Sequence, residues 1–446
     1  MQDITRRPVF FMRTANSSKR ILNYFCFFRA KPKRLPLVSC LVMATIQPFA
    51  ALRPKPSLAQ HVCELPYDVI SSEEARDVAK DNPYSFLHVS KPEIDLETGI
   101  DVYSEAVYEK GAENFRLLLD QGALVQDAEP CFYLYRQIFG EHVQVGLVAV
   151  ASCQEYDEGV IKKHELTRPI KEDDRVQHIE ALNSQTGPVF LTCCTSANYD
   201  AFVDRIIGGK PDIDLTAPDG VQHASWVIDD KKDMAFIKRQ FSSIDYLYIA
   251  DGHHRTAAAS RINRLRNGAG QSAWFLAVIF PHDQIQILAY NRVVKNLNGL
   301  DASQFLFELQ DIFEVSENHN GECSANNEFG LYLDGRWWRL LFKGDKDKSK
   351  TLVAGLDVSI LQHHVLEPLL GVSDPRTSDC IDYIGGIHGL IELERLVDSG
   401  HYACAFSLFP TRIDDLMEIA GANGVMPPKS TWFEPKLRDG MFCHMI

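Results

Sequence analysis

One stretch of the chain joins two different structural patterns within fifteen residues, namely residues 246–260, Tyr-Leu-Tyr-Ile-Ala-Asp-Gly-His-His-Arg-Thr-Ala-Ala-Ala-Ser. It begins as an apolar run of β-branched and aromatic residues that ends near Gly252, a pattern that predicts a buried strand. From Thr256 onward the Ala-rich sequence predicts a helix. The polar residues 251–255 are therefore expected at a strand-to-helix turn.

A turn of this kind suits an anionic ligand. A helix N-terminus presents free N–H groups and a partial positive charge, which attract phosphate. Gly252 permits close approach of the backbone, and the planar fork of Arg255 matches phosphate oxygens. His253 and His254 are able to transfer protons or bind metal. The alternative interpretation is a hydrogen-bonded turn whose polar residues have no role in ligand binding.

The sequence from Asp251 to Arg255, followed by small residues, resembles the signature of a largely bacterial family known as domain of unknown function 1015. Other family-like stretches are residues 66–76, 161–169, 185–190 and 426–436. The resemblance covers the chain from about Met43 to its C-terminus.

This resemblance implies a fold and an activity. The family is related to the ParB/sulfiredoxin-like fold, in which a Gly-x-x-Arg turn before a helix holds nucleotide phosphates. Some relatives of that fold are free-serine kinases, which make O-phosphoserine. By resemblance, the chain is a phosphotransferase that uses ATP or ADP with Mg²⁺, and Asp251, Gly252, His253, His254 and Arg255 hold the phosphates.

A second polar cluster supplies candidates for catalysis. His164 and Glu165 place an imidazole beside a carboxylate, and such a carboxylate near a nucleotide binds Mg²⁺ or accepts the proton of an attacking hydroxyl. Asp68 is the other candidate for this carboxylate, or it simply stabilises a turn. We therefore expect Glu165, His164, Asp68 and His254 to be catalytic, and Glu165 and Asp251 to be metal ligands.

Four further residues are candidates for phosphate binding, namely Lys163, Arg168, Thr186 and Gly187. Thr186 offers a hydroxyl and Gly187 a backbone N–H in a polar turn before a strand. That turn is too short for a Walker loop and contains no Gly-Lys-Ser/Thr.

The composition limits the classes of partner that we expect this protein to bind. The net charge of −14 argues against nucleic-acid binding, which needs a basic face. Eleven cysteines without a Cys-x-x-Cys pair indicate reduced thiols rather than a zinc site of that type, and so a cytoplasmic protein. We expect a nucleotide and a small-molecule substrate as partners, no membrane, and leave a homo-oligomer open.

The first 42 residues differ from the rest, because they carry nine basic residues and one acidic residue. Such a leader is typical of an organelle transit peptide. The alternative is an unused upstream start, which we favour because the sequence from Met43 resembles the usual start of the family. The segment is excluded from the fold in either case.

Strands in hairpins, with helices between them, predict an α+β fold. Residues 43–298 would form the ParB/sulfiredoxin-like, nucleotide-binding domain, and residues 299–446 a C-terminal α+β region. Hairpins are predicted from residues 132–136 with 143–150, 274–280 with 284–290, and 330–333 with 337–342, and a strand at residues 85–89. The tail, residues 426–439, is either a lid over an anionic ligand or a docked arm.

Two other functions remain open at this point. One is a nucleotide-binding regulatory module without transfer chemistry, and the other is a hydrolase of a phosphorylated metabolite.

Overall fold

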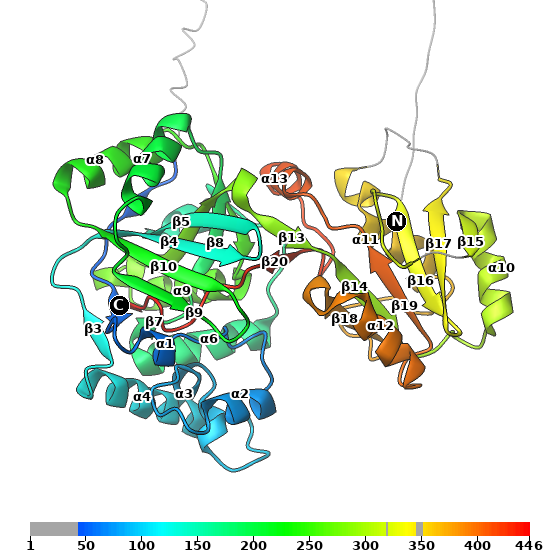
Figure 1. Ribbon diagram of the computed structural model, residues 1–446, viewed down its shortest axis with the longest axis horizontal. Coiled ribbons are helices and arrows are strands. Elements are labelled where there is room, and N and C mark those ends of the chain that lie inside the picture. Colours follow the sequence, from blue (N-terminus) through cyan, green and yellow to red (C-terminus); the bar gives the residue numbers. More distant parts are fainter. Residues whose placement is uncertain (1–42, 318–319, 345–350) are drawn as a thin grey trace, which may run out of the picture. The chain divides into compact units, whose positions relative to one another are not determined.

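The computed structural model describes residues 43–317, 320–344 and 351–446 (Figure 1). The leader predicted for residues 1–42 lies outside the described residues. The described part combines a large mixed sheet, an antiparallel sheet and surrounding helices, so the predicted α+β class is confirmed. No described helix has the length and apolar character needed to span a membrane.

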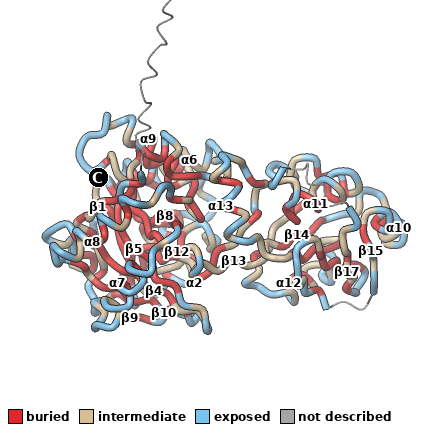
Figure 2. The backbone as a smooth tube through the Cα atoms, turned by 90° about the horizontal axis from the view of Figure 1, so that it is seen from above, coloured by how far each residue is buried: buried red, intermediate tan, exposed pale blue. Residues whose placement is uncertain are grey.

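The large sheet has nine strands in the order β6-β11-β8-β12-β5-β4-β10-β9, with β1 added to β5. β12 runs parallel to β8, β11 runs parallel to β6, and the other pairs are antiparallel. The strands are β1 (Ile46–Gln47), β4 (Phe132–Phe139), β5 (His142–Ser152), β6 (Ile161–Lys162), β8 (Val189–Cys193), β9 (Ile213–Thr216), β10 (Gln222–Ile228), β11 (Leu247–Asp251) and β12 (Trp274–Pro281). Buried residues concentrate in the central strands (Figure 2).

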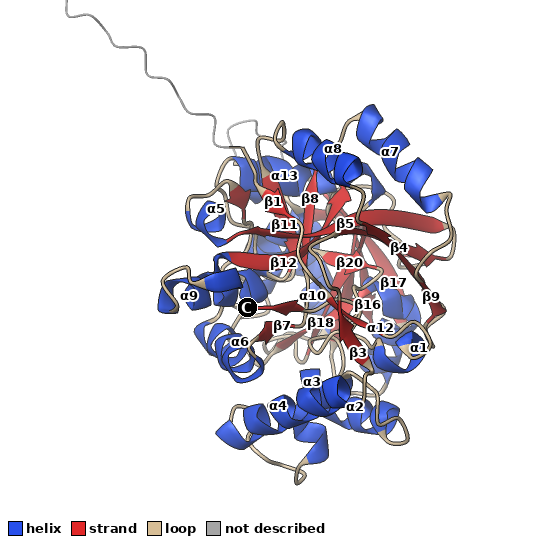
Figure 3. Ribbon diagram, turned by 90° about the vertical axis from the view of Figure 1, so that its left-hand side faces the viewer, coloured by secondary structure: helices blue, strands red, loops and turns tan. Residues whose placement is uncertain are grey.

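Helices lie on both sides of this sheet, and the three helices between residues 72 and 120 form a further layer away from it (Figure 3). The helices are α1 (Ala59–Val62), α2 (Ser72–Ala79), α3 (Leu87–Ser90), α4 (Glu105–Asp120), α5 (Cys153–Asp157), α6 (Pro169–Leu182), α7 (Ala197–Ile207), α8 (Lys231–Phe241) and α9 (His253–Leu265). α6 packs against α9 through Val176, Ile179, Ala258 and Ile262. This contact fixes the N-terminal ends of two helices that carry candidate site residues.

The second sheet has six antiparallel strands in the order β15-β17-β16-β19-β14-β18. They are β14 (Tyr290–Val294), β15 (Phe313–Glu317), β16 (Glu328–Leu333), β17 (Arg336–Phe342), β18 (Ile381–Gly385) and β19 (Cys404–Leu408), accompanied by α10 (Ala302–Ile312), α11 (Asp357–Leu361), α12 (Gly389–Asp398) and α13 (Ile413–Gly421). The predicted β16–β17 hairpin is confirmed. Its turn places Asp334 at φ 51° and Gly335 at φ 71°, the left-handed pair that tight hairpins need.

Two local predictions are wrong. The strand predicted at residues 85–89 is replaced by a turn and the helix α3 (Leu87–Ser90), and the Ser85 hydroxyl accepts a hydrogen bond from the Leu87 N–H at this turn. The strand β13 (Gln286–Leu288) pairs with β20 (Trp432–Glu434) rather than with β12. The reason is that both edges of β12 are already occupied, by β5 and β8.

The C-terminal tail returns to the large sheet. The strand β21 (His444–Met445) pairs with β7 (Ser184–Gln185), next to β2 (Leu52–Pro54), which pairs with β3 (Leu124–Gln126). Met441, Phe442 and Cys443 are completely buried. Arg438 donates a hydrogen bond to Nε2 of His223 and pairs with Asp219. The tail is thus a docked arm.

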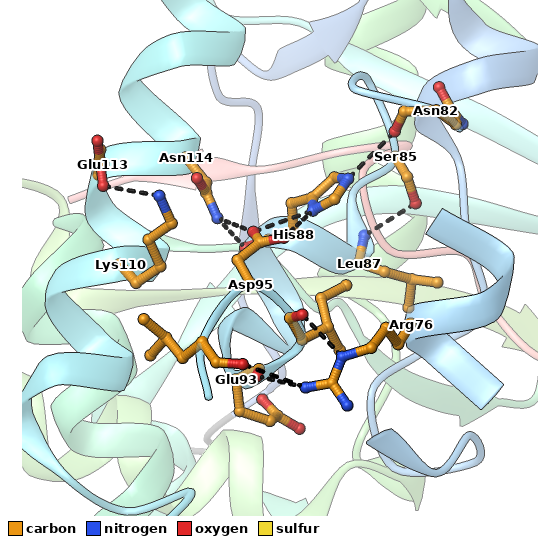
Figure 4. Close-up of polar contacts among 12 residues, drawn as sticks. Arg76, Asn82, Ser85, Leu87, His88, Glu93, Asp95, Lys110, Glu113 and Asn114 are labelled. Carbon is orange, nitrogen blue, oxygen red and sulfur yellow. Dashed lines mark hydrogen bonds and ion pairs between the residues drawn. The ribbon is translucent and has the colours of Figure 1, made fainter. Parts of the chain in front are cut away.

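A polar network holds the layer of α2, α3 and α4 together (Figure 4). Asp95, at the end of the 3₁₀ turn η1 (Pro92–Asp95), accepts hydrogen bonds from Nδ1 of His88 at 2.9 Å and from Nδ2 of Asn114 at 2.7 Å. Asn114 also donates to the backbone carbonyl of His88 at 2.7 Å. Arg76 donates to the carbonyls of Ile94 and Glu93. The network thereby fixes the segment after α3 that lines a cavity described below.

We predict that Asp95→Ala lowers the free energy of unfolding by about 1 to 2 kcal/mol, because it removes two acceptors from a partly buried network. Asp81→Ala, at an exposed position, is the control and should change stability by less than about 0.5 kcal/mol. Urea unfolding measures both. Equal values for the two variants would contradict a stabilising role of the network.

Candidate functional site

The predicted turn is shorter than expected. β11 ends at Asp251, Gly252 adopts φ 99°, and α9 begins directly at His253. His253, His254 and Arg255 therefore form the first turn of the helix, not a loop before it. The left-handed conformation of Gly252 allows this abrupt start, and the Thr256 N–H and hydroxyl both bond to the Gly252 carbonyl.

The N-terminus of α9 has no side-chain cap among the described residues. The first N–H groups of a helix lack intrahelical partners, so they are open to a ligand. Arg255 belongs to this first turn and is only 9% exposed. Its Nη1 donates to the Pro188 carbonyl and its Nη2 lies 3.5 Å from Oδ2 of Asp251, whereas its buried Nε has no hydrogen-bond partner in the described part of the chain.

Two glycines make room for the Arg255 guanidinium. A Cβ atom at Gly252 would lie 3.1 Å from Nε, and one at Gly187 would lie 3.3 Å from Cδ. Burial alone lowers the pKa of Arg255, but the surrounding carboxylates, Asp251 first, outweigh burial and raise it. Arg255 is therefore a fixed positive charge.

A cavity of about 150 Å³ opens at this helix end. Three carboxylates and three cations line it, namely Asp68, Glu165, Asp251, Arg255, Lys429 and Lys436. His253, His254 and the aromatic rings of Tyr67, Tyr290 and Trp432 complete the walls. This charge distribution suits an anionic group with an accompanying cation or proton.

A larger cavity of about 410 Å³ adjoins the first one. The two cavities share Tyr67, Asp68, His254 and Lys429. Its other basic side chains are Lys91, Arg168, Lys171 and Arg175. Its size is within the range of ordinary small-molecule sites, which the 150 Å³ cavity alone does not reach.

Asp251 is ionised and held in place. Its Oδ1 accepts a hydrogen bond from the Gly252 N–H at 2.8 Å, and its Oδ2 lies 3.9 Å from Nζ of Lys436. Burial opposes ionisation, but Lys436 and then Arg255 outweigh it and lower the pKa of Asp251 to about 2.

Glu165 differs from Asp251, because no described residue forms a hydrogen bond or ion pair with its half-buried carboxylate. Burial raises its pKa, and the charge of Lys429 only partly opposes this effect. The preceding His164 is 2% exposed, and burial lowers its pKa to about 4. Its ring stands at 89° to that of His253, with ring centroids 4.5 Å apart.

His253 and His254 have different surroundings. Burial, followed by the neighbouring His164, lowers the pKa of His253 well below its ordinary value. His254 lines both cavities, and its Nε2 accepts a hydrogen bond from the Arg168 N–H at 3.0 Å. Burial and then Arg168 lower the pKa of His254. In each ring Nε2 accepts a backbone N–H, so this nitrogen carries no proton.

Some predicted residues lie away from the 150 Å³ cavity. Lys163 lines neither cavity, and its ammonium lies 4.9 Å from the centroid of the Tyr156 ring. Thr186 and Gly187 line a separate space of about 30 Å³ on the other side of Arg255. Arg168 lines the 410 Å³ cavity. Asp68, in contrast, lines both larger cavities.

Three residues around Arg255, namely Tyr67, Arg175 and Asp439, were not predicted from the sequence. The guanidinium carbon of Arg175 lies 3.8 Å from the centroid of the Tyr67 ring, and Oδ2 of Asp439 accepts a hydrogen bond from the Tyr67 N–H at 3.3 Å. No local pattern marks them, because they are far apart in the sequence. The Pro-rich tail with its lysines and aromatic residues was the signal for Lys429 and Lys436, which line the cavity as parts of the docked arm.

Residues 46–359 match the family described as "Protein of unknown function (DUF1015)". The chain belongs to this family. Among curated proteins no match is found.

Three solved structures are similar to this DUF1015 protein. A free serine kinase in complex with AMP is 15% identical, with 64% of this chain and 86% of that chain covered and a TM-score of 0.33. A variant of a free serine kinase in complex with ADP is 16% identical, with coverages of 66% and 88% and a TM-score of 0.33. SbnI with a C-terminal truncation, from Staphylococcus aureus, is 11% identical, with coverages of 66% and 85% and a TM-score of 0.37. With TM-scores below 0.5 these structures do not show the fold of this chain, and the ParB/sulfiredoxin-like fold stays a prediction.

We predict that Gly252→Ala destabilises the protein more than Gly99→Ala does. Both glycines have φ above 90°, so each substitution introduces a similar backbone strain of about 1 kcal/mol. Only at Gly252 does the new Cβ also meet Arg255, whereas nothing lies within 4 Å at Gly99. Thermal unfolding of both variants measures the difference. Equal losses would show that Arg255 moves aside without cost.

Proposed function

We propose that this protein is a nucleotide-dependent phosphotransferase that acts on a small hydroxyl substrate, with free serine as the acceptor that the sequence resemblance favours. One observation carries the proposal. The uncapped N-terminus of α9 lies beside the buried Arg255, whose Nε has no partner among the described residues, and beside two lysines in the same cavity. Helix N–H groups and a guanidinium fork are the donors that phosphate oxygens need.

The proposal assigns a role to each charged group. The nucleotide phosphates occupy the 150 Å³ cavity, where Arg255, Lys429 and Lys436 neutralise them. Glu165 and Asp251 fit the pattern of one or two carboxylates that accompany phosphates around Mg²⁺, which would neutralise charge on the transferred group. Glu165 accepts the proton of the attacking hydroxyl, because its carboxylate has no described hydrogen-bond partner and burial raises its pKa.

The adjoining 410 Å³ cavity supplies room for the remaining ligand parts. Lys91 and Arg175 are paired with Glu93 and Asp174 in this cavity, whereas Arg168 and Lys171 have no ion pair with a described residue and suit an acceptor that carries a carboxylate. Asp68 and His254 stand at the boundary of the two cavities. A hydroxyl bound there would face the phosphate from the side of Glu165 and Asp68.

The proposal predicts that the full chain, given Mg²⁺, ATP or ADP, and a pool of small hydroxyl metabolites that includes serine, forms a phosphomonoester detectable by phosphorus NMR. Arg255→Ala should lower the rate about 100-fold or more, because it removes a buried charge at the phosphate position. Arg264→Ala is the matched control, since Arg264 lies on the same helix but outside both cavities.

The outcomes separate the proposed function from its alternatives. Nucleotide that binds but stays intact with every acceptor would overturn the transfer reaction and support a regulatory module. Phosphate released from phosphorylated metabolites in the absence of nucleotide would support a hydrolase.

The pH dependence identifies the base. Burial raises the pKa of Glu165, and only its ionised form accepts a proton, so kcat/KM should fall as the pH decreases through a value above the ordinary glutamate pKa of about 4.3. Glu165→Gln should lower kcat/KM to a residual rate that no longer shows this acid limb, and it should leave nucleotide binding. If Asp68→Asn abolishes the limb instead, Asp68 is the base and the assignment to Glu165 is wrong.

A further inference from the structure

We propose that His164, His253 and Glu165 form a binding site for a divalent transition-metal ion of the Zn²⁺ type. This site goes beyond the proposed phosphotransferase function and does not depend on it. In the part of the chain that the structure describes, these residues are the one group of three or more potential ligands whose ligand atoms converge, all within 4.8 Å of one another. An ion with bonds of about 2.1 Å needs ligand atoms about 3 to 4 Å apart, so small side-chain rotations suffice.

The sheet brings the three ligands together. β6 runs parallel to β11, with Ile161 opposite Leu247 and Lys162 opposite Tyr248. His164 and Glu165 follow the end of β6, and His253 follows the end of β11. The ligands therefore come from the same end of two paired parallel strands, with His164 and Glu165 in the segment after β6 and His253 at the first position of α9.

His164 is prepared for coordination by an unpartnered buried atom. Its side chain is almost completely buried, and its Nδ1 has no hydrogen-bond partner among the described residues. A buried imidazole nitrogen without a protein partner keeps its lone pair available, and a metal ion is able to use it.

The other two ligands are also available. Nε2 of His253 accepts a long hydrogen bond from the His164 N–H at 3.4 Å, and a metal ion at this nitrogen would replace that bond. The Glu165 carboxylate has no hydrogen bond or ion pair with a described residue. Together they complete a set of two imidazoles and one carboxylate around a single point.

The donor set decides the kind of metal. Two imidazole nitrogens favour Zn²⁺ and its neighbours in the first transition series, whereas Mg²⁺ prefers oxygen ligands alone. Three protein ligands leave a position open, as in catalytic zinc sites. Because Glu165 also lines the 150 Å³ cavity, a water molecule or an anion in that cavity is able to take this position.

The test uses the full chain, freed of metal with a chelator and titrated with Co²⁺ and with Zn²⁺ in the absence of nucleotide. Visible absorption of Co²⁺ reports tetrahedral or five-coordinate ligation, and calorimetry with Zn²⁺ gives stoichiometry and Kd. We expect one equivalent of either ion, no near-ultraviolet thiolate band, and no displacement by an equimolar amount of Mg²⁺. His164→Asn, His253→Asn and Glu165→Gln should each weaken binding at least 10-fold.

Two controls show whether a loss of metal binding comes from the loss of a ligand or from misfolding. His282→Asn, in the 3₁₀ turn η3 (His282–Gln284) outside this group, should retain full binding. Glu165→Gln loses no protein hydrogen bond, so circular dichroism should show an unchanged fold even if the histidine variants unfold.

The proposal is overturned if the unmodified protein binds neither ion below millimolar concentration. It is also overturned if Glu165→Gln binds as tightly as the unmodified protein, or if Mg²⁺ competes equally. Because the assay contains no nucleotide or acceptor, a failure of phosphate transfer leaves this result unaffected.

Discussion

The buried positive charge of Arg255 is the constraint around which the site is built. Removing a charge from water is costly unless nearby groups compensate it. Here Pro188 supplies a carbonyl and Asp251 a carboxylate, while Gly187 and Gly252 leave the space that the guanidinium occupies. Even so, Nε keeps no protein partner among the described residues. The protein compensates the charge but leaves part of its hydrogen-bonding capacity unused, which is what a preformed anion site requires.

The candidate site combines groups of opposite charge in a small volume. Lys436 and Arg255 keep Asp251 ionised, whereas Glu165 lies in surroundings that disfavour its ionised form. Two carboxylates with opposite pKa shifts are the arrangement expected when one has a structural role and the other takes part in proton transfer. The same Glu165 borders the two buried histidines, so a metal ion at that point would act directly on the cavity.

Local sequence patterns predicted the elements whose causes are local. The apolar run and the Ala-rich segment indicated β11 and α9, and Asp334-Gly335 indicated the β16–β17 hairpin. The first residue of α9 was misplaced, because the backbone conformation of Gly252 replaces the loop that the polar residues suggested. The pairing of β13 with β20 was not predictable from a neighbouring pattern, since it depends on both edges of β12 being occupied.

In the candidate site, too, residues marked by a local motif were predictable, whereas residues brought together from distant parts of the chain were not. Residues 251–255 were recognised from a contiguous motif, and the structure brings Asp68 and Glu165 into the same cavity. Lys163 was included because of its charge and sequence position, but it lies against Tyr156 instead. Asp439 and Tyr67 meet only through the course of the tail, and their sequence separation of 372 residues leaves no local signal.

The docked tail also sets an order of events during synthesis. Lys429 and Lys436 come from a segment that the ribosome makes after all other residues lining the 150 Å³ cavity. The strands of the large sheet are complete by Pro281, so the sheet has all its strands while the cavity still lacks two of its three cations. The candidate site is therefore incomplete in a nascent chain until its last segment has emerged and docked, and a ribosome that stalls after residue 425 would leave both lysines unmade.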